Sequence, residues 1–178
     1  MKTQQVELER PRPEEYAPYQ EIYVARVPAG SIVSLLRTQI TETLALLHRV
    51  PEEGAAFAYA PGKWTVKEVL GHLIDTERVM VYRALRIARN DVTPLSGFDE
   101  NLYAAEGRFA TRPIGSLVAE LATVRASTVS FFEGLPPDAW LRAGTANNYR
   151  LSVRGLGYVI AGHELHHVAI LKDRYHLR

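Results

Sequence analysis

Three of the six histidines in this chain fall within the ten residues from Gly162 to Leu171. His163 and His167 are four positions apart, so on an α-helix their side chains lie one turn above each other on the same face. Neutral imidazoles at this spacing can hold a divalent metal ion between them. His166 would point about a quarter of a turn away, and we expect it to flank the site.

The same stretch predicts an amphipathic helix, and the histidine pair lies inside its apolar stripe. The stripe follows the spacing i, i+3, i+4, i+7 and consists of Val153, Leu156, Ile160, His163, His167, Ile170 and Leu171. A buried imidazole needs a partner. A single core histidine usually bonds a neutral group, but two stacked rings without partners would each cost roughly 1–3 kcal/mol. One cation would satisfy both rings, so the pair favours a metal site.

Two histidines are too few for a catalytic metal site, because catalytic zinc usually takes three protein ligands and keeps one position for water. His72 is the candidate for the third ligand. Within its own predicted helix it lies roughly 160° from the centre of the apolar stripe. Val69, Thr76, Val79 and Met80 beside it could form a second buried face. Periodicity alone therefore leaves open whether His72 is a ligand or an exposed or interface histidine.

Three carboxylates lie close in sequence to these histidines. Glu77 falls in the middle of an apolar stripe, where an unpaired carboxylate would cost several kcal/mol, so it must be paired, hydrogen-bonded or next to the metal. An ion pair with an arginine and a catalytic role are both open. Asp75, Glu77 and Glu164 are the candidates for orienting metal ligands or transferring protons.

Four segments have the periodicity of long amphipathic helices. Ser31 and Ser152 are good N-caps of the first and the fourth, and Thr65 with Glu68 forms a capping box at the start of the second. We find no strand-type alternation of useful length. The helices are expected at about residues 31–50, 65–89 and 113–133 and from 152 onward.

These elements predict an all-α four-helix bundle with a long crossover, residues 90–112, between the second and third helices. The length and a hydrophobic content of 47% suit a single domain, residues 1–178. Prolines and tyrosines in residues 1–29 predict a wrapping arm with about one helical turn. The crossover should contain a short helix and roof a site. If the second and fourth helices are neighbours, His72 can meet His163 and His167.

Composition excludes several classes of function. The net charge is +1 and no basic stripe is present, so we expect no nucleic-acid partner. The chain has no cysteine, so any thiol chemistry must use a thiol from outside it. No apolar run has the length of a signal peptide or of a membrane span, and we expect a cytoplasmic protein without membrane contact. His48 and His176 lie at predicted helix ends, and we assign them to solvent.

Three segments resemble the DinB/YfiT-like superfamily: PGKWTVKEVLGHLIDTER at 61–78, PLSGFD at 94–99 and IAGHELHH at 160–167. The resemblance extends over nearly the whole chain and implies a four-helix bundle, usually a homodimer. It also implies that His72, His163 and His167 bind nickel or zinc. Relatives include thiol S-transferases that use bacillithiol, mycothiol or glutathione, a thiol-dependent maleylpyruvate isomerase, metal-dependent hydrolases and stress-induced proteins.

Three hypotheses remain from the sequence. In the first, a divalent metal activates a low-molecular-weight thiol or water against a small-molecule substrate, in an S-transferase or a hydrolase. In the second, the chain is a non-enzymatic dimeric stress-response protein that binds a metal or a small ligand. In the third, no metal binds and the histidines are satisfied internally. Imidazole ligands suit zinc, nickel, copper and iron alike, so the donor set leaves the metal open.

Overall fold

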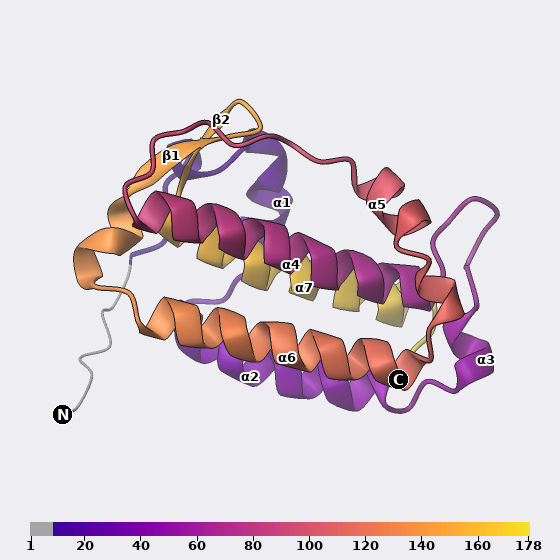
Figure 1. Ribbon diagram of the computed structural model, residues 1–178. Helices are drawn as coiled ribbons and strands as arrows, with labels where there is room; N and C mark the ends of the chain where they lie inside the picture. Colours follow the sequence, from indigo (N-terminus) through magenta and orange to yellow (C-terminus); the bar gives the residue numbers. More distant parts are fainter. Residues whose placement is uncertain (1–8) are drawn as a thin grey trace.

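The computed structural model describes residues 9–178. Four long helices dominate this part of the chain and confirm the predicted bundle (Figure 1). They are α2 (Ile32–Leu47), α4 (Val66–Ala88), α6 (Ile114–Glu133) and α7 (Val153–Arg174). Within the described residues, no helix is long and apolar enough to cross a membrane.

The helices begin where their capping residues predict. Ser31 Oγ accepts a hydrogen bond from the Ser34 amide at 3.3 Å, and Ser152 Oγ accepts one from the Gly155 amide at 2.8 Å. At the start of α4, Thr65 Oγ1 accepts from the Glu68 amide while the Glu68 carboxylate accepts from the Thr65 amide at 2.7 Å. Each side chain satisfies an amide that has no partner within the helix, which fixes the first turn.

The four helices form a ring in which α4 packs against α6 and α7, and α2 packs against the same two helices. Consecutive long helices α2 and α4 therefore lie at opposite corners of the bundle (Figure 1). The connection between them contains the short helix α3 (Glu52–Ala55). The second and fourth long helices, α4 and α7, are neighbours, which meets the condition for His72 to reach His163 and His167.

The apolar core consists of two clusters separated by a polar layer. One cluster includes Leu36, Phe132 and Leu156, and the other includes Leu70 and Leu171. Between them each long helix contributes a buried polar or charged side chain. These residues are Gln39, Thr43, Glu77, Arg125, Thr128 and Glu164.

The predicted arm contains two 3-10 turns, η1 (Pro13–Glu15) and η2 (Pro18–Gln20), and the short helix α1 (Glu21–Val24). Residues 1–8 of the predicted arm lie outside the described residues. They include most of the N-terminal stretch in which we predict no signal peptide. Glu15 joins the arm to α7 by an ion pair with Arg154 and accepts a hydrogen bond from Ser152 Oγ at 2.7 Å. Burial alone would raise the pKa of Glu15, but hydrogen bonds from Arg154, the Arg12 backbone and Ser152 hold it at about 2.

Close backbone contact also fixes the arm on α7. A Cβ atom at position 162 would overlap the carbonyl oxygen of Tyr23, so only glycine fits this position. The helix α1 packs along α7 as a result. This contact places the Tyr23 ring beside the histidines.

The prediction that the chain contains no strands was wrong. Strands β1 (Ala143–Ala146) and β2 (Tyr149–Ser152) form an antiparallel hairpin after the 3-10 helix η4 (Pro137–Leu141). Its two turn residues, Asn147 and Asn148, have φ angles of 49° and 64°. A two-residue hairpin turn of this kind requires positive φ at both positions, and asparagine tolerates it better than most residues. The strands were missed because each has only four residues.

The crossover between α4 and α6 contains the short helix α5 (Glu100–Glu106) and the 3-10 turn η3 (Phe109–Thr111). Asp99 caps α5 by accepting hydrogen bonds from the amides of Asn101 and Leu102. Earlier in the crossover, the Leu95 amide donates to the Thr145 carbonyl and the Leu95 carbonyl accepts from the Asn147 amide, both at 2.9 Å. The crossover thus runs past the hairpin and along one side of α4 (Figure 1).

Candidate metal centre

Three histidines from two helices converge at one place in the bundle. His72 comes from α4, and His163 and His167 come from successive turns of α7. One ring nitrogen from each lies within 4.8 Å of the others, and His72 Nε2 is 2.9 Å from His163 Nε2. Among residues 9–178, this is the only group of three or more histidine and acidic side chains with such convergent geometry.

The position of His72 follows from the two buried faces of α4. The main apolar stripe packs into the bundle. On the side of His72, Val69, Thr76 and Met80 are also buried, and Val79 is partly buried. Since α4 contacts both α6 and α7, a residue far from the centre of the main stripe can still face α7. The second buried face suggested by the sequence is therefore present, and His72 lies on it.

Burial keeps all three rings neutral at physiological pH. Only 6% of His163 and 9% of His167 is exposed, and His72 is half-buried. Burial lowers the pKa of His72 to about 4 and, together with the neighbouring His72 and His166, lowers that of His167 to about 3. The pKa of His163 is well below its usual range because of burial first and the other histidines second. Neutral imidazole is the form that binds metals.

The geometry and the donor set fit a divalent metal. Two nitrogen ligands of a tetrahedral zinc ion lie about 3.3 Å apart, given zinc–nitrogen distances near 2.0–2.1 Å, and the separations here, 2.9 Å for one pair and within 4.8 Å for all, bracket that value. Thr76 Oγ1 lies 3.4 Å from His72 Nδ1 and leaves the Nε2 atom facing the other two rings. A polar partner on the outer nitrogen is the usual way to orient a metal-binding histidine.

The histidines line a cavity of about 340 Å³, within the range of small-molecule sites. Its walls come from the arm, the connection before α4, α4 itself, the crossover, the hairpin and α7. The lining residues are Tyr19, Gln20, Tyr23, Trp64, His72, Thr76, Met80, Arg83, Phe98, Glu100, Asn147, Val159, His163 and His167. Phe98 and Glu100 belong to the crossover, which was expected to roof a site.

Aromatic rings pack closely around the triad. The Tyr23 ring meets His163 edge-on with centroids 5.1 Å apart, and the Trp64 ring lies 4.7 Å from His72. Sequence reasoning missed these two residues as parts of the site, although it predicted the wrapping arm that contains Tyr23. His166 flanks the triad as expected, with its ring 5.2 Å from that of Tyr23.

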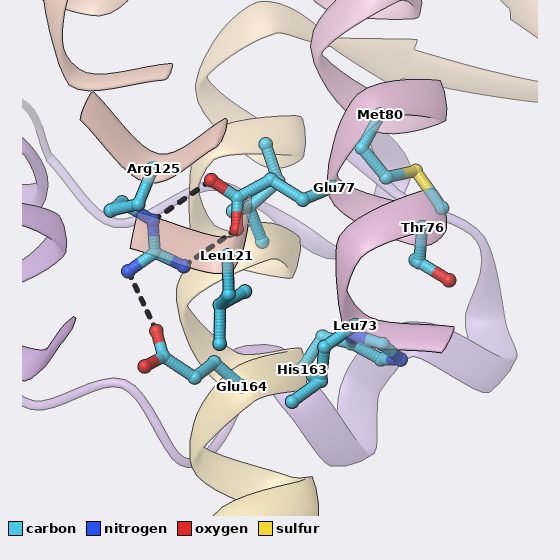
Figure 2. A pocket seen from close by; sticks show the side chains of 9 residues that line it. Leu73, Thr76, Glu77, Met80, Leu121, Arg125, His163 and Glu164 are labelled. Atoms are coloured by element: carbon cyan, nitrogen blue, oxygen red, sulfur yellow. Dashed lines mark hydrogen bonds and ion pairs between the residues drawn. The ribbon is translucent and has the colours of Figure 1, made fainter. Parts of the chain in front are cut away.

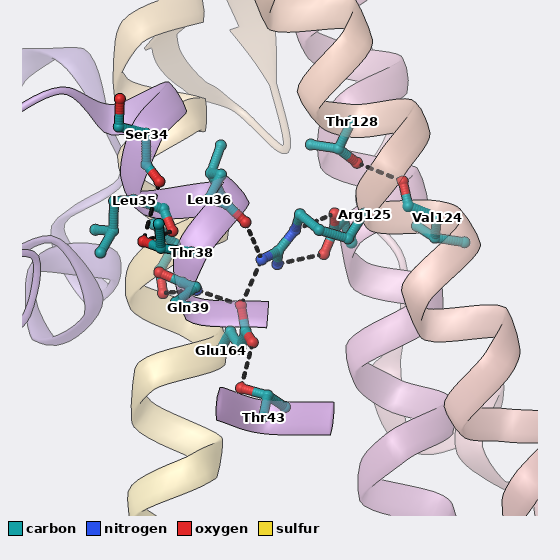
Figure 3. A network of polar contacts seen from close by, with 12 residues as sticks. Ser34, Leu35, Leu36, Thr38, Gln39, Thr43, Val124, Arg125, Thr128 and Glu164 are labelled. Atoms are coloured by element: carbon teal, nitrogen blue, oxygen red, sulfur yellow. Dashed lines mark hydrogen bonds and ion pairs between the residues drawn. The ribbon is translucent and has the colours of Figure 1, made fainter. Parts of the chain in front are cut away.

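Glu77 and Glu164 do not join the histidines. Arg125 donates to both carboxylate oxygens of Glu77, at 2.8 and 2.7 Å, and to Glu164 at 2.6 Å (Figure 2). Arg125 also donates to the Leu36 carbonyl at 3.2 Å. Thr43 donates to the other carboxylate oxygen of Glu164 (Figure 3). The sequence left an arginine pair and a catalytic role open for Glu77, and the structure places it in the ion pair.

This network joins all four long helices next to the triad. Glu164 directly follows His163 on α7, but its side chain points towards Arg125 (Figure 2). Between the network and His163 is a cavity of about 10 Å³, room for at most one water molecule. Asp75 lies elsewhere, with its nearest charged partner Arg78 at 3.9 Å, and burial raises its pKa. It does not line the large cavity.

Fold and site together define a four-helix bundle with a buried histidine triad beside a pocket of small-molecule size. The sequence profile of the DinB superfamily matches residues 35–171. The match covers most of the chain, so this protein belongs to the DinB superfamily. No curated protein matches the chain.

Solved structures share the fold, among them the following two. YfiT from Bacillus subtilis, a probable metal-dependent hydrolase with an unusual four-helix bundle topology, superposes with a TM-score of 0.73 over 94% of this chain and 92% of its own. A mycothiol-dependent maleylpyruvate isomerase superposes with a TM-score of 0.64 over 82% of this chain. This chain spans about three fifths of that enzyme, 61% of its length. Each is 16% identical in sequence, so the likeness is one of fold.

Proposed function

We propose that this protein is a metal-dependent enzyme that binds zinc or nickel through His72, His163 and His167 and acts on a small molecule. The convergence of three neutral imidazoles on the wall of a 340 Å³ cavity carries the proposal. A structural metal site would be closed by a fourth protein ligand. Within residues 9–178, no fourth histidine or carboxylate completes the cluster, which favours a catalytic site.

A divalent cation with an open position lowers the pKa of a bound water or thiol and so supplies a nucleophile at neutral pH. The chain contains no cysteine, so a thiol nucleophile would be an external low-molecular-weight thiol. The name of one structural neighbour indicates hydrolysis, in which water is the nucleophile, and the name of the other indicates dependence on a thiol. We therefore propose thiol S-transfer or hydrolysis as the reaction class.

The residues around the triad have separable tasks in this proposal. Thr76 orients His72, while Tyr23 and Trp64 exclude water from two sides of the rings. Glu77 and Glu164 hold α4 and α7 in register through Arg125 and take no part in proton transfer. Asp75 does not line the cavity and has no role in this proposal.

Turnover by metal-loaded protein tests the proposal. Protein loaded with zinc or with nickel would be assayed against a thiol-transfer panel and an ester and amide panel. We expect metal-dependent turnover in one panel, its loss in His163→Ala, and its retention in the matched control His48→Ala, because His48 is exposed and outside the site. A loaded sample inactive in both panels would instead support a non-enzymatic metal- or ligand-binding protein.

The family resemblance also leads us to propose a homodimer. Light scattering on the purified chain, with a monomer mass of 20.0 kDa, distinguishes a dimer from a monomer. The dimer is independent of the metal proposal, since the triad is complete within one chain.

A further inference from the structure

Arg83 is a buried cation in the wall of the same cavity as the histidines. Only 3% of it is exposed, and it extends from α4. It donates to the Ser96 carbonyl at 2.8 Å and contacts Met80 Sδ at 3.7 Å. The guanidinium carbon lies 5.7 Å from the centroid of the Phe98 ring. A guanidinium has five N–H donors, so these contacts leave donors for a further partner.

The surroundings of Arg83 differ from those of the other buried arginines. Arg125 and Arg154 each pair with buried carboxylates. Within residues 9–178, no carboxylate forms an ion pair with Arg83. An arginine stays charged at neutral pH even when buried, and a buried charge without a counter-ion is costly. A ligand anion would supply the missing partner.

The remaining lining of the cavity defines the body of such a ligand. Tyr19, Tyr23, Trp64 and Phe98 present aromatic rings to the cavity. The one acidic residue in the lining is Glu100, which is exposed on α5 and does not pair with Arg83. The cavity therefore combines one desolvated cation with flat apolar walls, which suits an unsaturated or aromatic organic anion.

The spacing along α4 sets the length of the ligand. His72, Thr76 and Arg83 lie on one face of the helix, and eleven residues correspond to roughly 16 Å of helix. The contact with Met80 shows that Arg83 extends back along α4 towards the histidines. An elongated ligand could place its anionic group at Arg83 and its reactive end at the triad.

We propose that Arg83 binds a carboxylate or similar anionic group, so that the cavity takes small, elongated organic anions with a flat apolar body. The anionic group could belong to the electrophilic substrate or to the low-molecular-weight thiol. Only the placement of the reactive end at the histidines rests on the proposed function, because anion binding at Arg83 requires no metal.

Calorimetric titration of the full-length protein, as purified and after chelation, tests the assignment. The first pair of probes is cinnamate and its neutral isostere cinnamamide. Because a charge-assisted hydrogen-bonded pair is lost, we expect about 10- to 100-fold weaker binding of cinnamamide by the parent and of cinnamate by Arg83→Met. Arg89→Met, with the same change of charge at the exposed end of α4, should bind cinnamate like the parent.

A second pair of probes distinguishes the source of the anion. N-acetylcysteine and N-acetylcysteamine differ in the carboxylate, and an Arg83-dependent preference for the former would assign Arg83 to the thiol. A preference within the cinnamate pair alone would assign it to the substrate. Thermal unfolding checks that Arg83→Met folds, and Arg83→Lys, which keeps the charge without the planar fork, should bind with intermediate affinity.

Three outcomes would overturn the assignment: equal binding of the acid and its neutral analogue in both probe pairs, unchanged binding of the preferred acid by Arg83→Met, or no carboxylate binding in either arm. The chelated sample separates this result from the metal proposal. If the chain binds no metal but still discriminates cinnamate through Arg83, the proposed function fails and the anion site stands. If the chain binds metal but does not discriminate the acid from its neutral analogue, the anion site fails and the metal proposal stands.

Discussion

Arg125 is the cation on which the polar layer of the bundle depends, so replacing it should strongly destabilise the fold. Arg125, Glu77 and Glu164 are 1%, 5% and 2% exposed. The change Arg125→Met keeps an unbranched apolar stem but leaves both carboxylates buried without a cation. Breaking a buried ion pair by removing one partner costs about 3–5 kcal/mol. With solvent excluded from all three groups, we expect a loss of about 4 kcal/mol at pH 7.

Urea and thermal unfolding measure this loss. For a domain of this size, 1 kcal/mol corresponds to roughly 2–4 °C in Tm, so Tm should fall by about 8–16 °C. The gap between parent and variant should narrow as the pH falls from 7 to 5. In the variant, the folded state would bind protons on the unpaired carboxylates more readily than the unfolded state, so acidification stabilises it relative to the parent.

The triple variant Arg125→Met, Glu77→Gln, Glu164→Gln is the matched control. It removes the buried charges as well as the cation, and most of the lost stability should return. The reasoning would be refuted if the unfolding free energy of Arg125→Met lies within about 1 kcal/mol of that of the parent, which is the effect of an ordinary substitution. The polar layer would then contribute little to the stability of the fold.

Further predictions concern the arm and the triad. Glu15→Gln should be less stable than the parent at pH 7, and the difference in unfolding free energy should vanish as the pH falls from 4.5 towards about 2, the pKa of Glu15. Gly162→Ala should lower Tm and speed proteolysis of the arm, because its Cβ overlaps the Tyr23 carbonyl. Thr76→Val should weaken zinc binding in calorimetry about tenfold, by freeing the outer nitrogen of His72.

Each of these has a control and a contradicting result. A stability difference for Glu15→Gln that is the same at pH 3 and pH 7 would contradict the ion pair. Gly115→Ala on α6, where an added Cβ meets no atom, should leave the arm unchanged; equal proteolysis in both glycine variants would contradict the close contact. Unchanged zinc affinity in Thr76→Val, with Tm also unchanged, would remove Thr76 from the site.

Much of the fold could be predicted because its signals are local. The capping residues Ser31, Thr65 and Ser152 mark the starts of three long helices, and each makes the predicted bond. The hairpin was missed, although Asn147 and Asn148 carry the signal of a tight turn with positive φ. Strands of four residues between helices are too short for alternation to show.

The site was less accessible to sequence reasoning because its contacts are long-range. His163 and His167 are linked by helical spacing, whereas His72 reaches them only through the packing of α4 on α7. The need of Glu77 for a partner could be seen, but Arg125 lies 48 residues away on another helix. Arg83 carried no local signal, since its lack of a carboxylate is a property of the folded cavity.

The metal content of the protein tests the central claim most directly. The chain would be purified without added metal or a histidine tag, beside the triple variant His72→Ala, His163→Ala, His167→Ala, and both would be examined by elemental analysis. We predict about one zinc or nickel ion per chain in the parent and none in the variant. A parent that holds no metal, even after incubation with zinc or nickel at neutral pH, would contradict the claim.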